Sequence, residues 1–136
     1  MEINEALDFV RQNPRAVLVT LRQDGTPQTS PVLAAVDDAG HVVISTRQTA
    51  MKTKHVRRDP RAWVCALNDR FFGGWVQVSG SVEVVDLPEA MEPLVQYYRA
   101  LSGEHDNWDE YRAAMEREQR CILRITVERA GPDFHG

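Results

Sequence analysis

One short stretch of the sequence concentrates the residue types that bind anions. Residues 45–61, STRQTAMKTKHVRRDPR, hold six of the sixteen basic residues and both lysines of a chain whose net charge is −4. The hydroxyls of Ser45, Thr46 and Thr49 come just before the lysines, where a strand should end and a short helix begin. Hydroxyls, free backbone N–H groups and a helix dipole favour a bound anion, and lysine adds a point charge. The stretch therefore predicts either a phosphate site or a plain solvated basic surface.

Two features favour the phosphate site. The basic residues are clustered in one stretch of an otherwise acidic protein, and the strand end that leads into this stretch is rich in hydroxyls. Other chemistries lack their motifs: the eight glycines form neither GxGxxG nor a Walker loop, and no GxSxG occurs. The four histidines show no metal-ligand spacing and there is no CxxC, so no metal site is predicted, and no catalytic residue is assigned. Cys65 and Cys121 lie in apolar runs and are expected to be buried free thiols, although a disulfide stays open.

Length and composition indicate an ordinary globular protein. The 136 residues suit a single domain spanning 1–136, with 43% hydrophobic and 26% charged residues. The acidic balance argues against a nucleic-acid partner, which would favour a basic excess. No apolar run approaches the roughly 20 residues that cross a bilayer, and the acidic residues 1–8 do not resemble a signal peptide. A cytoplasmic protein without membrane attachment is therefore expected.

Hydrophobic periodicity supplies the elements that would position the basic stretch. Residues 16–21 form a continuous apolar run, which predicts a strand buried on both faces. Residues 76–84 alternate between apolar and polar, and Gly80 within them predicts a bulge or a close backbone approach. Because strands and helices do not alternate regularly, a small closed antiparallel barrel with accessory helices is favoured. Strands are expected at 16–21, 28–36, 41–46, 62–67, 76–84 and 121–127, and helices at 2–11, within 49–59, at 87–101 and from Asn107 onward.

Several of these segments resemble one known family. Residues 18–32, LVTLRQDGTPQTSPV, resemble the opening of the pyridoxamine-phosphate-oxidase-like split-barrel proteins. Residues 45–61 are similar to the cofactor-phosphate segment of the F420-dependent branch, and residues 78–83 to the central strand of the family. Residues 97–111 are similar to the tail of certain small F420-dependent reductases. The resemblance implies a mainly β, six-stranded antiparallel Greek-key split barrel with accessory helices, forming a homodimer with a cofactor groove between the subunits.

The resemblance also implies a cofactor and its binding residues. The cofactor would be coenzyme F420, or alternatively FMN, with its phosphate on Lys52 and Lys54. One departure is His55, where the family commonly has asparagine. Trp63 and Trp108 are assigned to packing. The implied cofactor residues are Gln28, Ser30, Pro31 and Val32 along the ring, Ser45, Thr46, Lys52 and Lys54 at the phosphate, and Trp75 near the ring or tail.

The implied reaction is hydride transfer from the reduced deazaflavin to an electrophilic, conjugated small molecule. An FMN-dependent oxidase or reductase on the same barrel is an alternative, as is a non-catalytic protein that binds the cofactor or a tetrapyrrole. Arg47, Arg57 and Arg58 add more positive charge than one phosphate requires, since a phosphate carries about two negative charges. This surplus favours a ligand with a longer polyanionic part, as in the polyglutamyl tail of F420.

Overall fold

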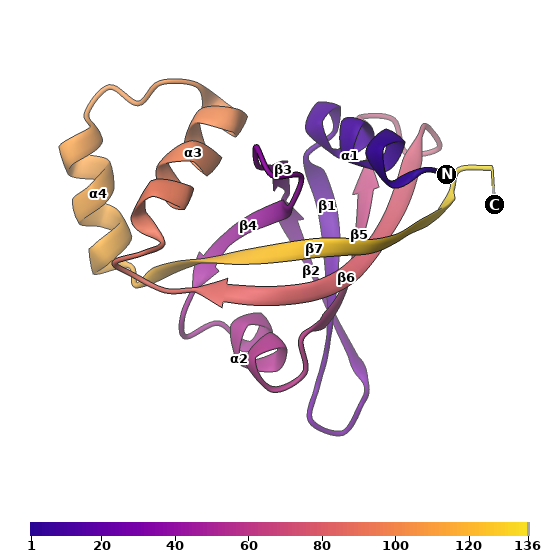
Figure 1. The fold of residues 1–136 in the computed structure, drawn as a ribbon, viewed down its shortest axis with the longest axis horizontal. Coiled ribbons are helices and arrows are strands. Elements are labelled where there is room, and N and C mark those ends of the chain that lie inside the picture. The colour runs from indigo at the N-terminus through magenta and orange to yellow at the C-terminus, as the bar shows by residue number, and fades with distance from the viewer. Residues whose placement is uncertain (136) are drawn as a thin grey trace.

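Seven antiparallel strands form one continuous, strongly curled sheet in the order β2-β1-β5-β6-β7-β4-β3 (Figure 1). The structure is a computed structural model and describes residues 1–135. The strands are β1 (Arg15–Leu21), β2 (Pro27–Leu33), β3 (Ala35–Val36), β4 (Val42–Arg47), β5 (Arg61–Leu67), β6 (Trp75–Val85) and β7 (Arg120–Asp133). Four helices accompany them: α1 (Ile3–Gln12), α2 (Met51–Arg58), α3 (Met91–Ser102) and α4 (Trp108–Arg117). The predicted mainly β split barrel is confirmed, with seven strands in place of six.

The additional strand arises where the chain crosses from one end of the sheet to the other. The single strand predicted at 28–36 is interrupted at Ala34, which is fully buried and donates its N–H to the Pro14 carbonyl at 2.8 Å. Before this residue β2 pairs with β1, and after it β3 pairs with β4. Because β2 and β3 are the two outermost strands, Ala34 joins the two edges of the sheet. The chain thus connects the two edges of the curled sheet at Ala34. Elsewhere β2 and β4 are not paired with each other.

The longest ladder joins β6 to β7 and contains the predicted irregularity. The register shifts between Ser79 and Gly80 where β6 faces β7. A Cβ atom on Gly80 would overlap the Thr126 carbonyl oxygen, so both the bulge and the close backbone approach are confirmed. Pairing continues as far as Asp133 opposite Val76, which extends the last strand well beyond the predicted 121–127.

Two hydrophobic clusters lie on opposite sides of the sheet. The larger fills the barrel and includes Leu18, Ile44 and Val64, with α1 packed against it. The smaller lies between β3, β4 and β7 on one side and the α3–α4 pair on the other, which stand together at one end of the molecule (Figure 1). The Asn107 side chain accepts from the Glu110 N–H at 3.1 Å, which confirms the predicted N-cap of α4. Among residues 1–135 no helix is both long and apolar enough to cross a membrane.

The outer face of β2, β1, β5 and β6 is left partly uncovered. Inward residues of β1 are buried, but its outward residues are only half-buried, so the prediction that 16–21 is buried on both faces is wrong for one chain. Cys65 lies on this outer face and is half-buried, whereas Cys121 is fully buried, and both are free thiols. The outward, partly exposed apolar residues are Val17, Val19, Leu21, Pro31, Leu33, Trp63, Leu67 and Trp75.

Candidate functional site

The split between β2 and β4 is the first component of the site. β3 pairs with β4 only at Val42 and Val43, so the edge of β4 from Ile44 to Arg47 carries no strand partner on that side. The outer edge of β2 is likewise unpaired, because β2 ends the sheet. Unpaired strand edges present N–H and C=O groups that can bind a ligand. We call this break in pairing between the β2 and β4 edges, which are joined at Ala34, the opening; its unpaired backbone groups can hydrogen-bond to a ligand.

Sequence-predicted ring residues lie on the β2 side of this opening. Gln28, Ser30 and Val32 stand opposite Thr20, Leu18 and Ala16 of β1, and so share the barrel-facing side of the strand. All three are half-buried, although their β1 partners are buried, because β2 has no neighbour on its other edge. Pro31 points the other way, opposite Val17 on the outer face, and is exposed. The structure therefore brings three of the four predicted ring residues to the opening.

Helix α2 begins at the other end of this opening and is fixed by two buried contacts. Thr53, which is fully buried, donates its hydroxyl to the Arg47 carbonyl at 2.7 Å. His55 is also buried, and its Nδ1 lies 3.0 Å from the Thr20 hydroxyl. Burial, followed by the charges of Arg58 and Arg22, lowers the pKa of His55, so the neutral ring is favoured. His55, which departs from the family, thus anchors α2 to β1.

The N-terminus of α2 carries no cap. Its N-cap is Ala50, whose side chain cannot accept from the amides of the first turn, and no acidic residue lies in that turn. Uncapped first-turn amides and the helix dipole together attract an anion. Lys52 lies in this first turn and is half-buried.

A group of cations surrounds this helix end. Arg47, at the end of β4, stands directly opposite Arg120, at the start of β7. Glu118 is their shared acidic neighbour: Arg120 binds it at 2.9 Å, whereas Arg47 is 3.8 Å away. Burial and the charge of Arg120 lower the pKa of Lys52. Arg47 and Arg120 thus share one carboxylate, and the charge of Arg120 reaches Lys52, so a bound anion would relieve the repulsion among the three cations.

The remaining predicted phosphate residues differ in position. Ser45 is half-buried beside the free edge of β4, but Thr46 is buried opposite Cys121 and faces the barrel interior. Lys54 is exposed, and residues two apart on a helix do not face one another, so Lys54 lies on a different side of α2 from Lys52. Within one chain, Ser45 shares a face of β4 with Arg47, whereas Thr46 faces the barrel interior and Lys54 lies on a different side of α2 from Lys52.

The arginines considered for a polyanionic tail are partly engaged. Arg57 makes two hydrogen bonds to the carboxylate of Asp86, at 2.7 and 2.8 Å, and Gln48 donates to the same group at 3.1 Å. Arg58 is exposed and donates to the Leu21 carbonyl on the other side of α2. Leu21 is followed by Arg22, whose charge and that of Arg58 both act on His55. Arg57 is thus committed to the protein, while Arg58 and Arg22 form a second basic group.

Two residues near the opening are not evident from local sequence. Tyr97 of α3 donates its hydroxyl to the Leu33 carbonyl at the end of β2, at 2.8 Å. Burial raises the pKa of Tyr97, and its hydroxyl lies at the end of β2. Arg120 joins the cations through the β4–β7 pairing. Both contacts join distant segments, although Tyr97 lies within the expected helix 87–101 and begins residues 97–111, which resemble the tail of small F420-dependent reductases.

Trp75 lies away from Lys52 within a single chain. It begins β6 opposite Leu67, on the partly exposed outer face. The β1–β5 register places that row near Arg15 and Leu33, whereas α2 lies beside Leu21 at the other end of β1. Trp75 therefore cannot contact a cofactor that is bound at α2 of the same chain. The predicted cofactor role of Trp75 stays a prediction and requires a second subunit.

Comparison with known proteins agrees with this architecture. The family model described as pyridoxamine 5'-phosphate oxidase matches residues 3–132. The chain belongs to the pyridoxamine 5'-phosphate oxidase family. Membership points to flavin-related oxidoreductase chemistry, and the site built from the β2 and β4 edges and α2 lies within the matched residues.

Solved structures share the fold of this pyridoxamine 5'-phosphate oxidase family member. The conserved hypothetical protein Rv2991 from Mycobacterium tuberculosis has a TM-score of 0.77 at 26% identity, covering 96% of this chain and 82% of that one. A protein described as F420 reductase has a TM-score of 0.68 at 19% identity, covering 90% and 93%. A nimc/nima family protein from Clostridium acetobutylicum has a TM-score of 0.65 at 21% identity, covering 91% and 81%. The latter two likenesses concern the fold.

Proposed function

We propose that this protein binds coenzyme F420 and transfers hydride from the reduced deazaflavin to an electrophilic, conjugated small molecule. The observation that carries the proposal is the cation group at the uncapped end of α2, beside the open β2 and β4 edges. Similarity to a structure described as F420 reductase supports the choice of cofactor. When bound, the reduced deazaflavin supplies the hydride, and the protein supplies position and surroundings.

The residues present fit a phosphate group. A phosphate carries about two negative charges at neutral pH. Arg47, Lys52 and Arg120 provide three positive charges, against the single carboxylate of Glu118. The first-turn amides of α2 provide further donors. In this proposal Lys52 and Arg120 bind the phosphate, and the half-buried β2 residues line the ring through backbone groups.

A second basic group supports F420 over FMN. Arg58, at the C-terminal end of α2, contacts the carbonyl of Leu21 beside Arg22, and Lys54 is exposed on the same helix. A polyanionic tail that leaves the phosphate site and passes along α2 would meet these charges. FMN has no such tail, so the additional cations would contribute to the binding of F420 alone.

We further propose that the protein is a homodimer whose subunits pack through the outer sheet face. Val17, Val19 and Trp63 form part of a largely apolar surface that one chain leaves half-exposed. Contiguous apolar surface of this kind is typical of an interaction site. A second copy would cover this face and could bring its own Trp75 to the neighbouring cofactor.

Equilibrium titration of the purified, cofactor-free protein tests the choice of cofactor. F420 and FMN are each added at low and high salt, and binding is followed by fluorescence. The proposal predicts tighter binding of F420, with a preference over FMN that shrinks at high salt because salt screens the tail. Equal affinities at both salt concentrations, or tight binding of FMN alone, would contradict the assignment to F420.

A further inference from the structure

The turn between α4 and β7, which lies beside the end of β4 (Figure 1), holds an acidic side chain where a helix disfavours one. Glu118 is the C-cap of α4, and the partial negative charge at this end of a helix opposes a carboxylate. Gln119, the next residue, has φ +55°, a conformation that strains a residue with a side chain. The Gln119 carbonyl accepts from the Gln48 N–H at 2.9 Å, which ties the turn to the chain just after β4. Two locally unfavourable features are therefore held next to each other.

Arg120 compensates the charge of Glu118. The Nε and Nη2 atoms of Arg120 lie 3.0 and 2.9 Å from the same carboxylate oxygen, Oε1 of Glu118. Arg47, directly opposite Arg120 on β4, lies 3.8 Å from that oxygen. The hydrogen bond from Arg120 is the main cause that lowers the pKa of Glu118, so the carboxylate is charged at neutral pH. An anion of the chain itself thus occupies one edge of the Arg120 guanidinium.

The occupied edge is one that a phosphate would use. A guanidinium binds phosphates and carboxylates most strongly through two parallel N–H groups, and Nε with Nη2 is such a pair. Arg120 cannot offer this pair to Glu118 and to a phosphate at the same time. The side chains of Glu118 and Arg120 are 32% and 28% exposed, and a partly exposed ion pair contributes little to stability. Exchange of the carboxylate for a phosphate is therefore inexpensive.

We infer that Glu118 is a counter-ion that the cofactor phosphate displaces from Arg120. The inference rests on the proposed function, because it takes Arg120 as a phosphate ligand. While Arg120 binds Glu118, its charge is balanced within the chain. When Arg120 binds the phosphate instead, the Glu118 carboxylate turns to solvent at the end of α4. Glu118 thus competes with the cofactor and lowers the affinity of the site for it.

Titration of the purified, cofactor-free full chain with F420, FMN and inorganic phosphate tests the inference. Glu118→Gln nearly keeps the size of the side chain and removes its charge. This variant should bind all three ligands roughly three- to tenfold more tightly, because the competing ion pair is lost. The exposed Glu116→Gln, two residues earlier on α4, makes the same change in net charge and is the matched control. It should leave the three affinities nearly unchanged.

Arg120→Gln shows whether Glu118 acts through Arg120. If the two groups compete as inferred, Glu118→Gln should give no gain in affinity in the Arg120→Gln background. Thermal unfolding establishes that each variant is folded. Weaker binding by folded Glu118→Gln would overturn the inference, because Glu118 would then hold Arg120 in position for the phosphate. A gain that persists in the double variant would also overturn it.

The three ligands separate this inference from the proposed function. If Glu118→Gln tightens the binding of FMN and inorganic phosphate through Arg120, but F420 binds no better than FMN, the assignment to F420 is wrong and the role of Glu118 stands. If F420 binds most tightly while Glu118→Gln changes no affinity, the inference is wrong and the proposed function stands. Failure of all three ligands to bind both the native protein and Glu118→Gln would contradict both.

Discussion

Arg47 and Arg120 face one another across the β4–β7 ladder, and both lie within ion-pair distance of Glu118, while the charge of Arg120 also acts on Lys52. Like charges directly opposite on neighbouring strands destabilise a sheet. A protein that retains such a pair at an uncapped helix end is suited to a ligand that neutralises it. The two lysines look equivalent in the sequence but differ in the structure. Lys52 is half-buried and subject to the charge of Arg120, whereas Lys54 is exposed.

Lys52→Ala is expected to weaken cofactor binding much more than Lys54→Ala. Lys52 is half-buried beside Arg120, so its bond to phosphate would contribute about 1.5–3 kcal/mol, or roughly ten- to a hundredfold in affinity. Lys54 is exposed and should contribute only through its charge. Fluorescence titration of both variants measures the difference. Equal losses would show that the phosphate is not held at the Lys52 side of α2.

Val19→Glu is expected to produce a monomer. Val19 stands opposite Trp63 within the half-exposed outer face, and a carboxylate there would be buried without a partner in a dimer. Light scattering at micromolar concentration should show half the native mass. Ala113→Glu, on the exposed side of α4, is the control and should keep the native mass. A native protein that is already monomeric would refute the dimer.

His55 should make stability fall in mild acid. The pKa of His55 is lowered in the folded state, so the unfolded chain binds the proton more readily. The contribution of His55 to the free energy of unfolding is therefore fully present above about pH 6.5, the ordinary pKa of histidine. It is lost as the pH falls through the lower pKa of the folded state. Urea unfolding at several pH values measures this loss. His55→Asn should show a weaker pH dependence in that window, and an identical dependence would assign the effect to other groups.

Gly80→Ala is expected to destabilise the fold by about 2 kcal/mol or more, since overpacking forces the backbone to shift. The added methyl would overlap the Thr126 carbonyl in the β6–β7 ladder. Gly103→Ala offers a comparison, because it meets no atom within contact distance but has φ +79°. The loss of stability in Gly103→Ala would come from backbone strain alone. Thermal unfolding of both variants separates the steric overlap from the strain.

The sequence predicted most elements because their signals are local. Alternation located β6, and Asn107 located the start of α4. The break at Ala34 was missed, since the apolar pattern continues through it and only pairing with opposite ends of the sheet separates β2 from β3.

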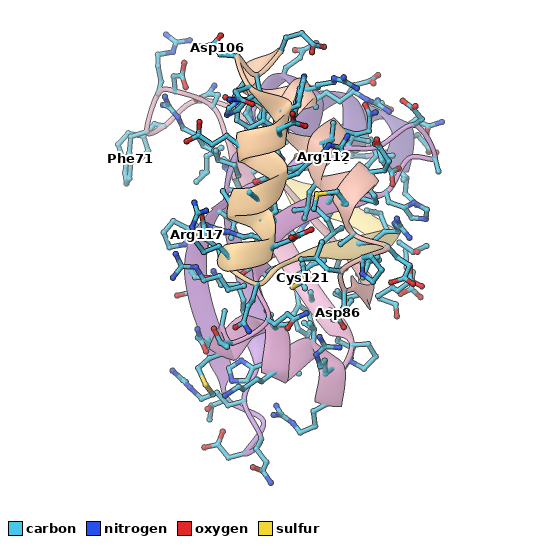
Figure 2. All side chains as sticks on the ribbon, turned by 90° about the vertical axis from the view of Figure 1, so that its left-hand side faces the viewer. Phe71, Asp86, Asp106, Arg112, Arg117 and Cys121 are labelled. Atoms are coloured by element: carbon cyan, nitrogen blue, oxygen red, sulfur yellow. The ribbon has the colours of Figure 1, made fainter. Side chains whose placement is uncertain are left out.

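The site was predictable only in part, because some of its residues meet only through pairing between distant segments. Arg47 and Lys52 are close in sequence, but Arg120 joins them through strand pairing across more than sixty residues. Arg57 looked free, yet Asp86 from the end of β6 engages it. Phe71, almost fully exposed on the β5–β6 loop, projects away from the body (Figure 2), and no local pattern predicts that exposure.

The most direct test of the central claim is a crystal structure of the protein with coenzyme F420 bound. The proposal predicts that the phosphate lies within hydrogen-bond distance of Lys52 and Arg120 at the N-terminus of α2. The deazaflavin ring should lie along β2 beside Gln28 and Ser30, and the tail should run toward Arg58. A phosphate bound elsewhere, for example at Arg129 on the outer face, with the Lys52 side chain free, would contradict the site proposed for this chain.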